Sequence, residues 1–190
     1  MRHAATPGNL RKPYTIQGLR PDSALAPEGE AQARAVVIPP VAAVYSSPLI
    51  RARETARIVT NGSRVIEDAG LLEVDVGDWS GLTWDEIAQR WPVERVAFEE
   101  DAEWHGYYGG ENLAQVRDRV LPAISRIVAA HPDESVLIVS HGVVNRVLLA
   151  HWLGLPLRFA RKLPQDNVGC NVIDFQEGIA KVRTINRLSE

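Results

Sequence analysis

Two kinds of apolar pattern alternate along this 190-residue chain. Short uninterrupted apolar runs, bounded by proline, glycine or serine, are typical of strands buried in a sheet. Such runs occur at residues 41–45, 65–66 and 136–139. Apolar residues spaced three and four positions apart predict amphipathic helices instead. These helices are expected over residues 27–37, 47–60, 84–91, 113–130 and 143–153.

Capping residues refine two of these helix starts. Ser47 followed by Pro48 predicts an N-cap and a first helical residue. Thr83 with Glu86 three positions later fits a capping box, in which each residue satisfies a free amide of the other.

Other segments lack a helical period. Residues 1–26 are polar and aperiodic, so they are predicted to form a long loop, and residues 92–112 are the least regular part of the remaining chain. Near the end, two apolar segments at 169–175 and 179–185 flank the turn 176–178 and predict a β-hairpin.

Strands that alternate with helices indicate an α/β domain with a largely parallel sheet, and 190 residues suit a single domain over residues 1–190. In such sheets, ligands bind beyond the carboxyl ends of the strands. His141 follows the 136–139 run, Arg51 lies in the first turn of a predicted helix, and Glu73 follows the 65–66 run. Because helix N-termini favour anions, these positions suggest a weak hypothesis of an anion site.

The composition excludes several classes of protein. A net charge of -3 argues against a nucleic-acid partner, which would favour a basic surface. The single cysteine, Cys170, excludes an intramolecular disulfide and a cysteine-cluster metal site. No window approaches 18 consecutive apolar residues, and the N-terminal stretch lacks the apolar core of a signal peptide. We therefore expect a cytoplasmic protein without membrane contact.

Four segments, in order along nearly the whole chain, resemble the histidine phosphatase superfamily, also called the phosphoglycerate-mutase-like family. They are the start Arg2-His3-Ala4 and the segments SSPLIRARETA, LLEVDVGDWSGLT and VSHGVVNRVLL. Ala4 stands where the family usually has glycine. The resemblance implies a three-layer α/β/α fold, with helices on both faces of a mostly parallel sheet and a small helical cap. Residues 74–132 would supply the cap and one helix that packs on the sheet.

The resemblance also implies the chemistry. His3 would attack phosphorus to form a phosphohistidine, and Glu73 would protonate the leaving alkoxide and then accept a proton from the hydrolytic water. The phosphoryl oxygens would be held by Arg2, Arg51, His141, Gly142 and Asn9. Thr6 and Ser47 could add hydrogen bonds.

The two histidines of this site face opposite demands. His3 must be neutral to attack, and neighbouring arginines disfavour a further positive charge on it. His141 is better charged, because it donates to the phosphate, and a bound dianion would favour that protonated form.

Other site chemistries lack support in the sequence. The histidines show no ligand spacing such as H-E-x-x-H, and no glycine-rich nucleotide fingerprint is present. Cys170 has no arginine six residues on, which argues against a cysteine phosphatase. We therefore expect neither a metal nor another cofactor.

The reaction class follows from the short separation between Glu73 and His141. Mutases of the family carry an insertion there, so a phosphatase that acts on a small phosphorylated metabolite is favoured over a phosphoglycerate mutase. The cap aromatics Trp104, His105 and Tyr108 are candidates for substrate contact, or they simply pack the cap. A homodimer is left open.

The start of the sequence raises a further question. In the family, an apolar strand precedes the nucleophilic histidine, and we expect such a strand before Arg2 although the sequence begins at Met1. If the fold lacked this strand, a phosphate-binding or regulatory module with little turnover would become the alternative function.

Overall fold

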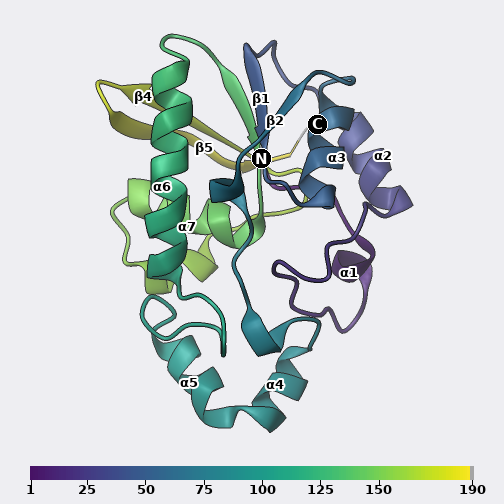
Figure 1. Cartoon of the computed structure of the whole chain (residues 1–190), viewed down its shortest axis with the longest axis vertical. Coiled ribbons are helices and arrows are strands. Elements are labelled where there is room, and N and C mark those ends of the chain that lie inside the picture. The colour runs from purple at the N-terminus through teal and green to yellow at the C-terminus, as the bar shows by residue number, and fades with distance from the viewer. Residues whose placement is uncertain (189–190) are drawn as a thin grey trace.

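A computed structural model describes residues 1–188 (Figure 1). The strands are β1 (Ala43–Ser46), β2 (Val65–Glu67), β3 (Val136–Val139), β4 (Cys170–Gln176) and β5 (Ile179–Arg187). The helices are α1 (Pro7–Leu10), α2 (Pro27–Ala35), α3 (Ile50–Val59), α4 (Trp84–Arg90), α5 (Pro92–Glu100), α6 (Leu113–Ala130) and α7 (Gly142–Trp152). Short 3₁₀ segments are η1 (Ala69–Leu71), η2 (Gly77–Trp79) and η3 (Leu157–Lys162). None of the helices within residues 1–188 is long and apolar enough to cross a membrane.

The sheet at the centre is parallel, as the sequence predicts. Its strand order is β2-β1-β3, with Val44 opposite both Val65 and Leu137. The predicted terminal hairpin is also present, because β4 and β5 pair in antiparallel fashion. Its turn includes Glu177 and Gly178, both with positive φ, which a tight turn requires.

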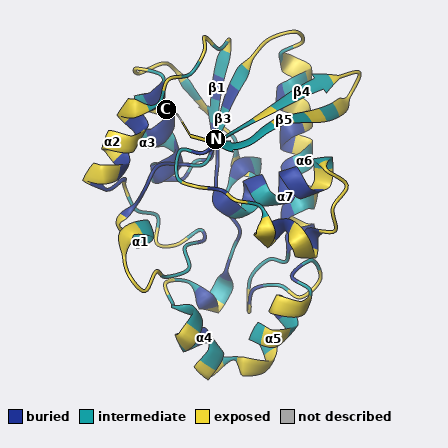
Figure 2. Cartoon of the chain, turned by 180° about the vertical axis from the view of Figure 1, so that it is seen from behind, coloured by how far each residue is buried: buried dark blue, intermediate teal, exposed yellow. Residues whose placement is uncertain are grey.

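Helices cover both faces of this sheet, and the alternation along each strand decides which face a residue joins. Val44, Leu137 and Val139 belong to the apolar cluster that contains residues of α2 and α3. Tyr45 and Ile138 pack instead against the cluster formed largely by α6 and α7. Figure 2 shows exposed residues along α2 and α6, whereas α3 and α7 are mostly buried or intermediate. The three-layer α/β/α prediction is confirmed.

The first three residues lie between the two sheets and join them. Met1 and His3 pair with Ser140 at the end of β3, through Ser140 N–H to Met1 O at 2.9 Å and His3 N–H to Ser140 O at 3.0 Å. On the other side, Arg2 N–H donates to Gly169 O at 3.0 Å, directly before β4. The short segment 1–3 therefore occupies a central strand position at the site edge of the sheet.

Beyond Met1, the space between β3 and the β4–β5 hairpin is a cavity of about 560 Å³. Its lining includes Met1, Val136, Ile138 and residues of β4. The Met1 amino group lies at this cavity and donates to Ile138 O at 2.8 Å. Burial lowers the pKa of that amino group. The expectation that an apolar strand precedes Arg2 stays a prediction.

The start of α3 differs from the expected one. The helix begins at Ile50 with Leu49 as its N-cap, so the prediction of Ser47 as N-cap is wrong. Ser47 Oγ accepts from Leu49 N–H at 3.3 Å, but Ser47 lies two residues before the N-cap position. The cap comes from a distant residue, because both carboxylate oxygens of Asp22 lie 3.0 Å from Ile50 N. Local sequence could not reveal a cap supplied across the fold.

The cap region is more helical than its sequence suggests. Pro92 starts α5 within the segment expected to be irregular. Its residues Val93 and Val96 are exposed, and Phe98 is the residue of this helix that is buried. The predicted capping box between Thr83 and Glu86 at the start of α4 is confirmed. In Figure 1, α4 and α5 lie at the bottom of the molecule, whereas β1 and β2 lie in its upper half.

Aromatic side chains hold the cap together. The fully buried ring of Trp79 packs edge-on against Trp84, Phe98 and Tyr107, with centroid separations of 6.0, 5.4 and 5.8 Å. Edge-to-face pairs at such distances stabilise beyond the area they bury. This cluster connects η2, α4 and α5 into one packed unit.

Gly29 provides a test of how tightly α2 packs on the segment that carries His3. A Cβ at Gly29 would lie 1.9 Å from Ala5 O, so Gly29→Ala should displace α2 and lower the free energy of unfolding by about 1–3 kcal/mol. Gly8→Ala is the matched control, because a Cβ there meets only ordinary contacts from 3.7 Å. Thermal unfolding of the two variants checks this, and equal melting temperatures would contradict it.

Candidate active site

His3 occupies a fixed, buried position at the end of the central pairing. Its backbone is held by Ser140, and the next residue, Ala4, donates its N–H to Thr55 Oγ1 at 2.9 Å. The His3 Nδ1 atom lies 2.7 Å from Ala4 O. Because a carbonyl oxygen can only accept, Nδ1 carries the proton in neutral His3. The lone pair then resides on Nε2, the atom available as a nucleophile.

His141 lies beside His3, with 5.2 Å between the ring centroids. It is the N-cap residue of α7, where free amide groups favour an anion. The side chain is fully buried, and neither Nδ1 nor Nε2 has a hydrogen-bond partner within residues 1–188. Buried ring nitrogens without a partner are costly, so this position is suited to a bound acceptor.

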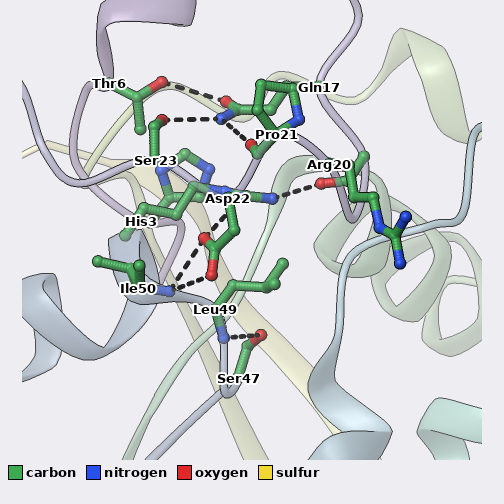
Figure 3. Close-up of polar contacts among 12 residues, drawn as sticks. His3, Thr6, Gln17, Arg20, Pro21, Asp22, Ser23, Ser47, Leu49 and Ile50 are labelled. Carbon is green, nitrogen blue, oxygen red and sulfur yellow. Dashed lines mark hydrogen bonds and ion pairs between the residues drawn. The ribbon is translucent and has the colours of Figure 1, made fainter. Parts of the chain in front are cut away.

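Arg2 and Arg51 supply two buried guanidinium groups. Arg2 Nη1 donates to Gln165 O at 2.6 Å, and Arg51 Nη2 donates to Gly18 O at 2.8 Å. Arg51 also forms a 3.4 Å ion pair with Asp22. Figure 3 shows the Asp22 carboxylate as it accepts from Ile50 N–H at the start of α3. The Nε atoms of both arginines have no partner in the described chain. Each guanidinium is thus anchored by part of its fork and leaves a donor unused.

Glu73 is held at the same edge by two backbone amides. Its Oε1 accepts from Val74 N–H at 3.0 Å, and its Oε2 accepts from Val143 N–H in the first turn of α7 at 3.3 Å. The side chain is buried but lines the pocket. An acid is therefore fixed beside the two histidines and the two arginines.

Arg119 is a positioning residue that the sequence reasoning missed. From α6 it donates to the carbonyls of Gly70, Leu72 and Glu73 at 2.8 to 3.2 Å, and it pairs with Glu111 at 2.7 Å. These bonds fix the loop that carries Glu73. The only sequence signal was an arginine beside the apolar face of a helix, which is usually a solvated charge.

Asn9 and Gly142 also lie at the pocket, as expected. Asn9 Oδ1 accepts from Thr6 N–H at 3.0 Å and from Asn167 Nδ2 at 3.3 Å. These two bonds use the amide oxygen of Asn9, so its amide nitrogen points away from Thr6 and Asn167. Gly142 begins α7, and a Cβ there would lie 3.5 Å from Arg2 Nε. Ser47 is buried but does not line the pocket.

Charge and burial set the protonation of the two histidines. Burial lowers the pKa of His3 well below its ordinary value, and the charges of Arg2 and Arg51 lower it further. Burial also lowers the pKa of His141, and His3 and Arg51 add to the effect. In the empty site both rings are therefore neutral. The expected charge on His141 requires a bound anion to offset the neighbouring cations.

The pocket above these groups has a volume of about 300 Å³. The cap contributes Trp84 and Tyr107 to its lining, and the loop before α2 contributes Tyr14. Trp104, His105 and Tyr108, the expected substrate contacts, are not among the lining residues. Trp104 is 64% exposed, and Tyr108 stacks on Trp91 at 5.6 Å. The expected contact of these three residues with substrate has no support in this geometry.

No group of three or more His, Cys, Asp or Glu side chains within residues 1–188 is placed to hold a metal ion. The pocket lining instead combines three arginines, His3 and Glu73, and His141 lies directly beside His3. This donor set suits an oxyanion, because arginine and neutral or charged imidazole donate hydrogen bonds to oxygen.

An α/β fold with two arginines and two histidines at the strand ends defines a class of phosphoryl-binding protein, and the comparison with known proteins identifies the family. Residues 1–188 match the sequence model of the histidine phosphatase superfamily (branch 1). The chain belongs to this superfamily, and its phosphoglycerate-mutase-like fold is confirmed. The solved structure of Bacillus stearothermophilus YhfR superposes with a TM-score of 0.90, at 33% identity, over 99% of this chain and 95% of that one.

Two curated relatives show similar identity over part of their length. The 2-carboxy-D-arabinitol-1-phosphatase of Triticum aestivum is 33% identical over 84% of this chain and 33% of its own length. Phosphoserine phosphatase 1 of Hydrogenobacter thermophilus is 31% identical over 70% of this chain and 64% of its own length. The chain thus spans less than two thirds of the length of these two curated relatives.

The lowered histidine pKa values predict a pH-dependent stability. A group with a pKa depressed by folding stabilises above its unfolded pKa, and this contribution is lost as pH falls below about 6.5. His141→Gln should therefore lose less stability than the wild type on acidification, whereas His151→Ala, which removes an exposed ring, should behave like the wild type. Thermal melts across pH measure this, and identical pH profiles for the wild type and His141→Gln would contradict it.

Proposed function

We propose that the protein is a metal-independent phosphomonoester hydrolase that acts on a small phosphorylated metabolite through a phosphohistidine on His3. The observation that supports this most directly is the set of buried nitrogen atoms without partners around His3: Nε of Arg2, Nε of Arg51, and both ring nitrogens of His141. Buried donors are normally satisfied, and the oxygen atoms of one phosphoryl group can accept from both guanidinium groups and from one ring nitrogen of His141.

The first half-reaction transfers the phosphoryl group to the protein. His3 Nε2 donates its lone pair to phosphorus while the bond from phosphorus to the ester oxygen breaks. Glu73 supplies the proton that the leaving alkoxide needs. Arg2, Arg51 and His141 donate to the equatorial oxygens, where negative charge concentrates in the transition state.

The second half-reaction restores the enzyme. Glu73, now deprotonated, accepts a proton from a water molecule as the water oxygen attacks phosphorus. The bond from phosphorus to His3 Nε2 breaks, and its electron pair returns to the imidazole. Phosphate leaves, and Glu73 holds the proton that the next cycle requires.

The bond between His3 Nδ1 and Ala4 O supports this role for Nε2. It fixes the tautomer and the ring orientation before substrate arrives, so little reorganisation is needed. The low pKa of His3 in the empty site also keeps the nucleophile neutral. The relatives' names as phosphatases favour hydrolysis over the mutase alternative.

Covalent labelling tests the nucleophile. Incubation with a radiolabelled phosphodonor in the presence of a chelator should yield acid-labile protein label, because phosphohistidine hydrolyses in acid. His3→Ala should abolish the label, and His151→Ala, which removes an exposed ring of α7, should retain it. Label that persists in His3→Ala would refute the assignment, and absence of label and turnover in the wild type would favour a binding module.

Glu73→Gln tests the acid and base role. The amide keeps the size of the side chain but cannot transfer a proton, so kcat should fall about 10²- to 10⁴-fold while substrate binding changes little. A leaving group that needs no protonation, such as a nitrophenolate, should restore the first half-reaction in rapid-mixing experiments. A normal kcat for Glu73→Gln with alkyl phosphates would contradict the role.

A further inference from the structure

Two arginines at the pocket remain unused by the proposed chemistry. Arg146 lies on α7, one turn after Gly142, and Arg161 lies on η3. Both line the same cavity as Arg2, His3 and Glu73. No carboxylate within residues 1–188 lies within ion-pair distance of either arginine.

Arg161 is held in place by rings, which do not neutralise it. Its guanidinium carbon lies 5.1 Å from the centroid of Trp84 and 5.1 Å from that of Phe98. Cation–π contacts orient a guanidinium plane and leave its N–H edge available. Because Trp84 belongs to α4 and Phe98 to α5, the cap itself fixes the direction of this cation.

The guanidinium group of Arg146 is held in place by one hydrogen bond to the backbone. Its Nε donates to Leu163 O at 2.9 Å, which leaves its Nη atoms free for another acceptor. A Cβ at Gly142 would lie 3.4 Å from Arg146 Nη1 and 3.5 Å from Arg2 Nε. Arg146 therefore lies next to the phosphoryl-binding arginine, on the side of Gly142 that faces the pocket.

Tyr107 connects these two cations with the catalytic acid. Its buried hydroxyl interacts electrostatically with the negative charge of Glu73 and with the positive charges of Arg161 and Arg146. Burial and the charge of Glu73 raise the pKa of Tyr107, so the hydroxyl remains a donor. Three donors thus surround the part of the pocket between the phosphoryl site and the cap.

The charge of the pocket exceeds what a phosphoryl group requires. In the proposed reaction, Arg2, Arg51 and His141 donate to the phosphoryl dianion. Arg146 and Arg161 add positive charge that Glu73 alone opposes among the lining residues. A planar carboxylate matches a guanidinium fork, and a pocket of about 300 Å³ has room for a small phosphorylated acid.

We propose that Arg146 and Arg161 form a second anion subsite that binds a carboxylate of the substrate, so that the enzyme prefers phosphomonoesters of small hydroxy acids or hydroxy amino acids. This inference rests on the proposed phosphatase function. The names of two relatives, a carboxyarabinitol phosphatase and a phosphoserine phosphatase, describe substrates of this chemistry.

Matched substrate pairs test the subsite. In 3-phosphoglycerate and glycerol 3-phosphate, and in phosphoserine and phosphoethanolamine, the members of each pair differ by a carboxylate. The wild type should favour the carboxylated member by about 10- to 100-fold in kcat/KM, as expected for hydrogen bonds to a charged group. Fructose 1,6-bisphosphate serves as the third arm, and a preference for it over both acids would show that the second anion is a phosphate and overturn the proposal.

Variants assign the preference to the two arginines. Arg161→Gln and Arg146→Gln should each reduce the ratio within a pair about tenfold, mainly through KM, and Arg161→Lys should restore part of it. Arg158→Gln is the matched control, because Arg158 lies on the same 3₁₀ segment but stacks on Phe159 and does not line the pocket. An unchanged ratio in both glutamine variants, with melting temperatures like the wild type, would overturn the proposal.

A binding measurement separates this inference from the proposed function. Calorimetry with His3→Ala protein compares phosphoserine and phosphoethanolamine without any turnover. Tighter binding of phosphoserine, lost in the His3→Ala/Arg161→Gln double variant, supports the subsite even if hydrolysis fails. Equal affinity for the two compounds refutes the subsite, even if phosphohistidine forms.

Discussion

The backbone pairing between residues 1–3 and the end of β3 is the constraint on which the whole site depends. Ser140 donates to Met1 O and accepts from His3 N–H, so the two chain segments advance in parallel and end together. This register places His3 beside His141, whose helix begins at the next residue. A slip of one residue would turn His3 to the opposite face of the sheet. The pairing of these backbone segments therefore determines where the side chains of the site lie.

The same arrangement concentrates uncompensated positive charge in a buried position. Arg2 and Arg51 lose solvation and gain only part of their hydrogen bonds from the backbone. The fold tolerates this because Asp22 and Glu73 offset part of the charge and because both histidines stay neutral. Such a site stabilises the protein less than an apolar core would, but it is organised for an anion before one binds. The buried charges lower the stability of the folded protein and make the site complementary to an anion.

The cap places a further cation at the same pocket. Its aromatic cluster is a rigid support, and Arg161 lies against that support with its charge directed at the pocket. The exposed aromatics that attracted attention in the sequence, Trp104 and Tyr108, lie outside the pocket. The family resemblance led us to expect the cap, and tertiary packing decides that Trp84 and Tyr107 line the pocket. Arg161 has no notable signal in the sequence, and it lines the pocket because of its position in the fold.

The sequence by itself determined the elements whose signals are local. The apolar run Val136–Val139, the period of α6 and the capping box of α4 each encode their own structure, because strand burial, helix amphipathicity and capping act over a few residues. The candidate residues His3 and His141 also followed from their motifs. Tertiary structure alone decided what depends on distant partners: Asp22 as the cap of α3, Arg119 as the residue that fixes the Glu73 loop, and the lowered pKa of His141. These features arise from contacts and burial between segments far apart in the chain, which no local pattern records.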